Sequence, residues 1–184
     1  MKQRSILWQA AGFAFVTFGG TMLHFLYDWT GGNILVSPFC GVNESTWEHM
    51  KLLFWPLFLY ALVQRLFFKK QANYWCVKLA EIMLGLALIP VLFYTYNGVF
   101  GKSPDWINIT IFYITALLAF LFERWAFKKD LLQCKSPRLA FAAICLIGVL
   151  FVVFTFVPPQ LPLFQDPLTG TYALCSPQSL YCSR

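Results

Sequence analysis

The sequence predicts an all-α integral membrane protein, a bundle of five transmembrane helices with a cytoplasmic N-terminus and an extracytoplasmic C-terminus. Composition is the first observation behind this prediction. Hydrophobic residues make up 59% of the 184 residues and charged residues only 12%, against about 25% charged in a typical soluble domain. The second observation is a set of five apolar runs, each near the roughly 20 residues that an α-helix needs to cross a bilayer. This composition excludes a disordered chain and an ordinary cytosolic enzyme.

The five expected spans belong to one membrane domain, 1–184, and cover residues 6–27, 52–68, 79–96, 106–122 and 139–157. Charged residues or prolines bound the runs, in chain order Asp28, Lys69, Lys78, Asp105, Glu123, Arg138 and Pro158. Because lipid offers the backbone no hydrogen-bond partner, each run is expected to be helical. The first run could instead be a signal peptide, but no small-residue cleavage site follows it, which favours a retained helix.

Lysine and arginine lie mainly on one side of the expected bundle. They precede the first span and cluster again between spans two and three and between spans four and five. Because cytoplasmic loops carry an excess of Lys and Arg, these segments are expected in the cytoplasm. The net charge of +6 then reflects orientation and attraction to anionic lipid, and it does not indicate nucleic-acid binding. The lipid bilayer is the expected partner, and partner proteins in the membrane are left open.

Two outer segments, the loop 28–46 and the tail 158–184, are expected to be irregular. The loop is rich in Gly, Asn, Ser and Pro, and the prolines at the start of the tail prevent a continued helix. Cys40, Cys175 and Cys182 fall in these segments, where Cys175 could bridge to either of the other two. Otherwise the cysteines, Cys76 and Cys134 included, are expected to serve as small apolar fillers.

Both histidines and several carboxylates gather at the outer ends of the first two spans. The set is His24, Asp28, Glu44, Glu48 and His49. Zn-type sites use imidazole nitrogen and carboxylate oxygen, so His24, Asp28, Glu44 and His49 are candidate ligands for a divalent metal ion. Glu48 and His49 are candidate catalytic residues, because histidine titrates near neutral pH and carboxylates can act as general bases.

Structural roles compete with functional ones for several of the ionisable residues. Ser45 and Glu48 fit a capping box, in which Ser45 caps the second helix and Glu48 bonds back to the amide of Ser45. Lys78 and Glu81 are three residues apart and are expected to pair, with a proton relay as the alternative role for Glu81. Glu123 is expected at a helix boundary, where it needs no special role.

The segment 43–49, Asn-Glu-Ser-Thr-Trp-Glu-His, resembles a motif of a family of small bacterial multi-pass membrane proteins of unknown function. Segments 23–27, 158–167 and 169–172 resemble the same family. The resemblance implies a bacterial cell-membrane protein and supplies no activity. It adds Asn43, Trp47 and Asp166 as site candidates. Since all these segments are expected outside, the tail could fold over the mouth of the bundle and bring Asp166 to the histidines.

Three functions compete at this point. The first is a membrane enzyme or metal-binding protein with an outward-facing polar site, for which the histidine and carboxylate cluster argues. The second is a small transporter or channel subunit, for which Pro56, Pro90 and Glu81 argue, because broken helices and buried charges are typical of transporters. The third is a structural partner in a membrane complex, whose many aromatic residues would contact other subunits.

Overall fold

The computed structural model describes residues 2–68 and 71–172, which form five α-helices and one short 3-10 helix. The elements are α1 (Lys2–Trp29), α2 (Thr46–Phe67), α3 (Tyr74–Phe100), α4 (Asp105–Lys129), α5 (Pro137–Phe156) and η1 (Pro162–Phe164). All five α-helices are long and apolar enough to cross a membrane. The expectation of an all-α membrane protein with five spans is therefore confirmed.

Most helices extend beyond the apolar runs that predicted them. α2 begins at Thr46 rather than at residue 52, α3 covers residues 74–100 rather than 79–96, and α4 continues to Lys129 rather than ending at residue 122. Helix ends in a membrane protein carry polar and charged residues that reach the bilayer interface. A criterion based on hydropathy leaves these terminal turns out, so it sets most of the helix limits too far inside.

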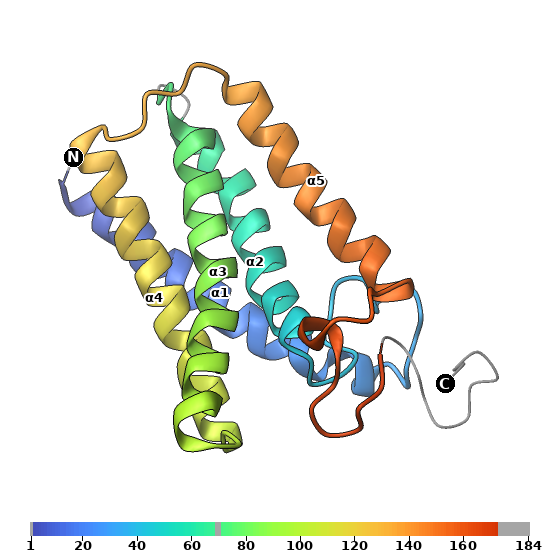
Figure 1. The fold of residues 1–184 in the computed structure, drawn as a ribbon. Coiled ribbons are helices and arrows are strands. Elements are labelled where there is room, and N and C mark those ends of the chain that lie inside the picture. The colour runs from blue at the N-terminus through green and yellow to red at the C-terminus, as the bar shows by residue number, and fades with distance from the viewer. Residues whose placement is uncertain (1, 69–70, 173–184) are drawn as a thin grey trace.

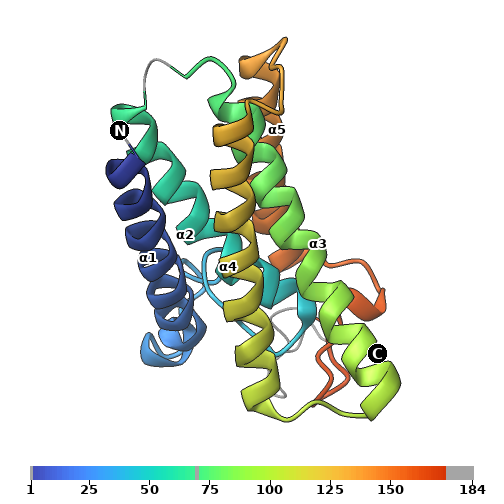
Figure 2. The same cartoon turned by 90° about the vertical axis from the view of Figure 1, so that its left-hand side faces the viewer.

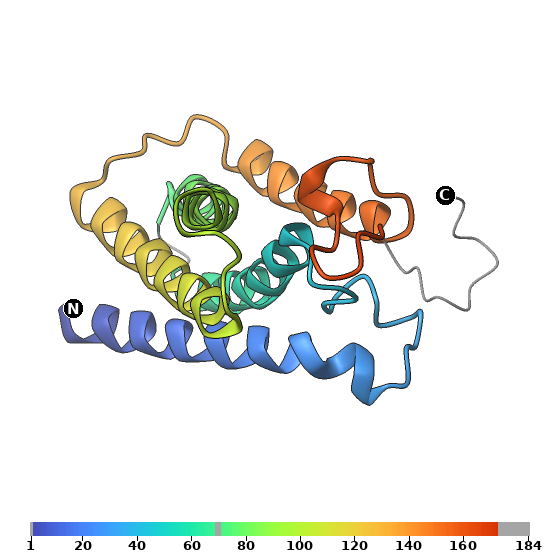
Figure 3. The same ribbon diagram turned by 60° about the horizontal axis from the view of Figure 1, so that its bottom comes forward.

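Successive α-helices run in opposite directions, so their ends form two groups (Figure 1). One group, here called the basic end because most Lys and Arg residues lie there, holds the start of α1, α3 and α5 and the end of α2 and α4. The loop end holds the connection 30–45, the turn 101–104 and residues 157–172. α4 lies between α1 and α3 (Figure 2), and α3 is surrounded by α2, α4 and α5 while α1 lies along α2 and α4 (Figure 3).

Close helix contacts depend on glycine, as expected for helices that pack in lipid. A Cβ atom on Gly20 of α1 would lie 2.9 Å from the carbonyl oxygen of Leu52 in α2. A Cβ atom on Gly85 of α3 would lie 2.7 Å from Cδ2 of Leu53. These close approaches bring α1 and α3 against α2, whose most apolar window is half buried and is the most buried of the five.

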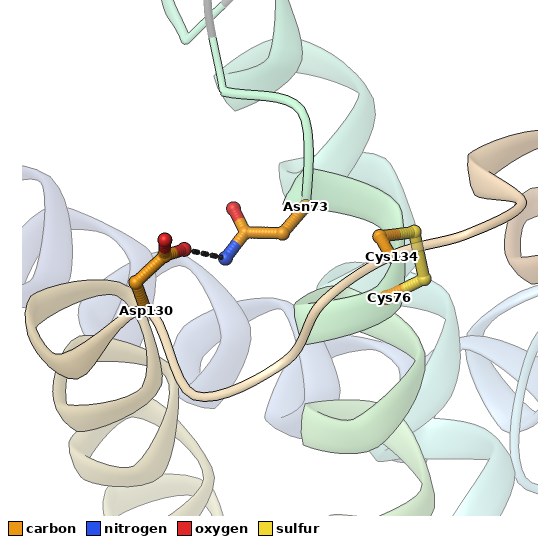
Figure 4. Close-up of a disulfide and its surroundings, with 4 residues drawn as sticks. All are labelled: Asn73, Cys76, Asp130 and Cys134. Carbon is orange, nitrogen blue, oxygen red and sulfur yellow. Dashed lines mark hydrogen bonds between the residues drawn. A yellow bond between two sulfur atoms is a disulfide. The ribbon is translucent and has the colours of Figure 1, made fainter.

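A disulfide between Cys76 and Cys134 fastens the α4–α5 connection to the first turn of α3 (Figure 4). The two Cα atoms are 5.7 Å apart. Beside the disulfide, Nδ2 of Asn73 donates to Oδ1 of Asp130 at 2.7 Å, which adds a second link between the same segments (Figure 4). The expectation that Cys76 and Cys134 are apolar fillers is therefore wrong, because α3 begins at Tyr74 and carries Cys76 to the neighbouring connection.

Two other cysteines fit the filler role. Cys145 is a free, half-buried residue of α5. Cys40 is free and buried in the connection 30–45, where burial raises the pKa of its thiol. Its Sγ donates to the carbonyl oxygen of Val36 at 3.1 Å. Cys175 and Cys182 lie outside the described residues, and so do both bridges expected for Cys175.

Reduction of the Cys76–Cys134 disulfide is expected to lower the free energy of unfolding by about 2–4 kcal/mol, because the crosslink restricts the unfolded chain. Thermal unfolding in detergent with and without reductant measures this effect, in a background where Cys175 and Cys182 are both serine. The effect should disappear in Cys76→Ser and persist in the control Cys145→Ser. A reductant effect that survives Cys76→Ser would contradict the assignment.

Candidate functional site

The carboxylate of Glu44 lies between the imidazole rings of His24 and His49 at the loop end. Oε1 of Glu44 is 3.6 Å from Nε2 of His24, and Oε2 is 3.6 Å from Nε2 of His49. The two ring centroids are 5.7 Å apart. The structure thus brings together three of the four expected metal ligands. The fourth, Asp28, is exposed near the end of α1.

Backbone contacts position Glu44 and His49, which lie on either side of the first residue of α2. The N–H of Gly41 donates to the carbonyl oxygen of Leu23 at 3.3 Å, which ties the connection 30–45 to α1. Ser45 is the N-cap of α2, and its hydroxyl accepts the N–H three residues later at 3.3 Å. Glu44 precedes this cap and His49 follows it by about one turn. The carboxylate therefore lies near the positive end of the helix dipole.

The hydrogen bonding of His49 determines what its other ring nitrogen presents to Glu44. Nδ1 of His49 is 3.0 Å from the carbonyl oxygen of Ser45. A carbonyl oxygen only accepts, so Nδ1 carries the hydrogen of this bond. In a neutral ring, Nε2 then directs a lone pair toward a carboxylate oxygen, which is repulsive. A proton or another cation between Nε2 and Glu44 removes the repulsion.

A small cavity adjoins Glu44 and His49. Its volume is about 20 Å³, and it is lined by Glu44, Thr46, His49, Ile89, Phe93, Asn108, Ile111 and Phe112. A volume of about 10–15 Å³ is enough for one water molecule when polar partners surround it. The cavity therefore has room for a single water next to the carboxylate and the imidazole, and α3 and α4 contribute mostly apolar side chains to its lining.

In the part of the chain that the structure describes, no group of three or more His, Cys, Asp and Glu side chains is arranged to hold a metal ion. The distances at Glu44 are those of ion pairs. Zn–N and Zn–O bonds are about 2 Å, so the three side chains would have to turn inward to share an ion. The ring separation of 5.7 Å is nevertheless short enough for both imidazoles to reach one ion.

Glu48, the other candidate catalytic residue, is engaged apart from the histidines. Its Oε2 is 2.7 Å from Nζ of Lys51 and accepts the N–H of Val42 at 3.0 Å. The expected capping box is therefore only half formed. Ser45 caps α2 as expected, but its own N–H donates to Oδ1 of Asn43 at 2.9 Å rather than to Glu48.

Lys51 is completely buried and joins three segments of the chain. Besides Glu48, its Nζ donates to the carbonyl oxygen of Ser37 at 2.8 Å and to Oγ1 of Thr155 at 2.9 Å. These contacts link α2 to the connection 30–45 and to the end of α5. This role of Lys51 was not predicted, although a lysine within a membrane helix needs a partner and is itself a signal.

The chain after α5 packs on α2 through Trp47. The ring centroid of Trp47 is 4.5 Å from that of Phe151 in α5 and 4.6 Å from that of Phe164 in η1. Asp166 is buried, and one carboxylate oxygen accepts the hydroxyl of Thr169 at 2.9 Å within its own turn. The described part of the tail, residues 158–172, thus packs on α2 at the loop end, while the carboxylate of Asp166 bonds within its own turn rather than to the histidines.

A second ionisable cluster lies inside the bundle toward the basic end. Nζ of Lys78 is 2.8 Å from Oε2 of Glu81 and 2.5 Å from Oε1 of Glu123, and all three residues are completely buried. Nε2 of Gln9 donates to the other oxygen of Glu123 at 2.7 Å. The Lys78–Glu81 pair was predicted. The role given to Glu123 was wrong, because α4 continues to Lys129 and places Glu123 in the interior.

Replacing Lys51 by methionine is expected to lower the free energy of unfolding by about 3–5 kcal/mol, because it leaves the carboxylate of Glu48 buried and unpaired. Thermal unfolding in detergent checks this, with the exposed Lys102→Met as the matched control. The double variant Glu48→Gln/Lys51→Met should regain part of the loss. Equal unfolding of Lys51→Met and Lys102→Met would contradict the prediction.

The comparisons with known proteins identify a family but no function. No curated protein and no solved structure matches the chain. A family model, described as "Family of unknown function (DUF6512)", matches residues 1–174, which covers all five helices and the cluster of His24, Glu44 and His49. The chain therefore belongs to this family of unknown function.

Proposed function

We propose that this membrane protein carries an acid–base site at its loop end, made by His24, Glu44 and His49. The observation that carries the proposal is the position of the Glu44 carboxylate, with one oxygen 3.6 Å from Nε2 of each histidine. Carboxylate and imidazole are the groups most often used for proton transfer. All three side chains are partly exposed, so a solute at the membrane surface can reach them.

Each group has a distinct part in the proposed chemistry. The carbonyl of Ser45 holds the ring of His49 through Nδ1, which leaves Nε2 to exchange a proton with Glu44. The neighbouring cavity of about 20 Å³ can hold the water or hydroxyl from which that proton comes. His24 faces the other carboxylate oxygen and stabilises its negative charge when its ring is protonated. The reaction class that fits is activation of a water or hydroxyl at the membrane surface.

A divalent metal ion such as Zn²⁺ is a second candidate for the same site. The proximity of two imidazoles and one carboxylate favours it, since two His and one Glu form a known Zn ligand set. Binding would require the rings to turn inward, because in the described residues no such group is arranged to hold an ion. Asp28, an expected ligand, is exposed near the end of α1 and forms no ion pair with either histidine in the described residues.

Nuclear magnetic resonance of the ¹⁵N-histidine-labelled protein tests the proposal, because the chain has only 2 histidines. Glu44→Gln removes the charge between the rings, so the imidazole signals of both His24 and His49 should change together. Asp28→Asn, an exposed carboxylate nearby, is the matched control and should change neither. Signals that are unaffected by Glu44→Gln would contradict an acid–base site centred on Glu44.

Titration of the same sample with Zn²⁺ distinguishes the two candidates. If the site binds metal, both histidine signals shift in a 1:1 ratio and elemental analysis finds zinc in the wild type but not in His24→Ala. If the site is purely acid–base, zinc changes neither signal. Zinc bound equally well by wild type and His24→Ala would exclude the metal candidate at this cluster.

We also propose that the protein resides in the cell membrane of a bacterium with its basic end in the cytoplasm. The resemblance of segment 43–49 and the position of Lys and Arg support this. The Cys76–Cys134 disulfide at the basic end favours the opposite orientation, since disulfides are rare in the cytosol.

Labelling of intact cells with a membrane-impermeant maleimide decides between the two orientations. Lys102→Cys at the loop end should react and Lys135→Cys at the basic end should not, since both residues are exposed and differ in sidedness alone. The reverse labelling pattern would place the disulfide outside the cytoplasm and contradict the proposed orientation.

A further inference from the structure

We propose that Glu81, Glu123 and Lys78 form a proton-binding site in the interior of the bundle, independent of the histidine site. Charge is the first argument. Two carboxylates and one ammonium group are completely buried together, so the cluster lacks one positive charge when all three are ionised. An unneutralised charge in an apolar interior is costly, and two close carboxylates commonly share a single proton.

The hydrogen bonds of the cluster show where that proton fits. Lys78 contacts one oxygen of each carboxylate, and Gln9 donates to the second oxygen of Glu123. The second oxygen of Glu81, Oε1, has no hydrogen-bond partner among the described residues although it is buried. Oε1 of Gln9 is also buried and unpartnered in that part of the chain. A proton on Oε1 of Glu81 neutralises the extra negative charge and turns this unpartnered acceptor into a hydrogen-bond donor.

Among the described residues, Lys78 is the only cation that forms an ion pair with Glu81 or Glu123. α4 contributes Glu123, and α2 contributes Tyr60, whose ring centroid is 6.0 Å from Nζ of Lys78. The ring centroid of Tyr74, one turn before Lys78 in α3, is 5.9 Å from the same Nζ atom. Within the described residues, α5 adds no ion pair to the cluster. The missing charge must therefore come from a small cation, and a proton is the one that needs no cavity.

Polar groups lead from the basic end toward this cluster. Glu81 lies roughly 10 Å along α3 from its first residue, at about 1.5 Å per residue. The hydroxyl of Tyr74, at that first residue, lies 2.6 Å from the carbonyl oxygen of Ala61 and 3.0 Å from Oε1 of Gln64, and the guanidinium of Arg65 lies 5.3 Å from the Tyr74 ring centroid. Asn73, the preceding residue, lines a hollow of about 710 Å³. Protons would therefore enter from the basic end.

On the opposite side, the cluster borders the apolar core. Ile82 and Leu86 of α3, Leu57 of α2 and Phe120 of α4 are buried members of one hydrophobic cluster. A proton bound at Glu81 thus exchanges with the basic end, and the apolar core separates it from the histidines.

Infrared spectroscopy of the protein in lipid nanodiscs tests the site at neutral pH. A protonated carboxylic acid gives a carbonyl stretch above the amide I band, which shifts in D₂O. Wild type should show this band, and Glu81→Gln and Glu123→Gln should each abolish it, because one carboxylate then pairs with Lys78. The control Glu48→Gln/Lys51→Met removes a neutral buried pair and should retain the band.

Two further measurements keep the test independent of the variants. Labelling wild type with ¹³C-carboxyl glutamate must shift the band if it arises from Glu81 or Glu123. Recording spectra in choline chloride and in sodium chloride distinguishes a proton from sodium. A band that is absent in wild type, or that survives either glutamine substitution, would overturn the proposal, as would a band lost when sodium replaces choline.

Discussion

Charged side chains inside a bundle in lipid have neither water nor headgroups to neutralise them, so they must find partners on neighbouring helices. Two interior clusters obey this constraint in different ways. Glu48 and Lys51 form a neutral pair at 2.7 Å, with a backbone N–H, a carbonyl and a hydroxyl completing their bonds. The cluster of Lys78, Glu81 and Glu123 is bonded less completely and needs one more positive charge when all three groups are ionised.

The same pairing determines which segments can lie together. Lys51 reaches the connection 30–45 and α5 at once, so the loop end can close only when α2, α5 and that connection are in register. Lys78 and Gln9 meet at Glu123, which aligns α1, α3 and α4 at the other end. Apolar packing alone tolerates sliding of one helix along another, whereas a buried charge separated from its partner costs about 3–5 kcal/mol.

The sequence was sufficient to predict the five helices, because an apolar run long enough to cross a bilayer can satisfy its own backbone hydrogen bonds only as a helix. It was insufficient for the helix ends, where polar turns continue past the apolar run. That difference explains the misassigned Glu123: a boundary at residue 122 makes it interfacial, while a helix to Lys129 makes it interior. The Cys76–Cys134 bridge depends on the same terminal turns and was missed for the same reason.

The histidine site was predictable in part, because sidedness alone places His24, Glu44 and His49 at one end. Sidedness does not give side-chain direction, so it also included Asp28, which is exposed, and Asp166, which bonds within its own turn. The N-cap of α2 then decides which of Glu44 and Glu48 faces the histidines. Ser45 starts α2, and Glu48 one turn later accepts from Val42 and pairs with buried Lys51. The carboxylate before the cap, Glu44, is therefore the one left to face both histidines.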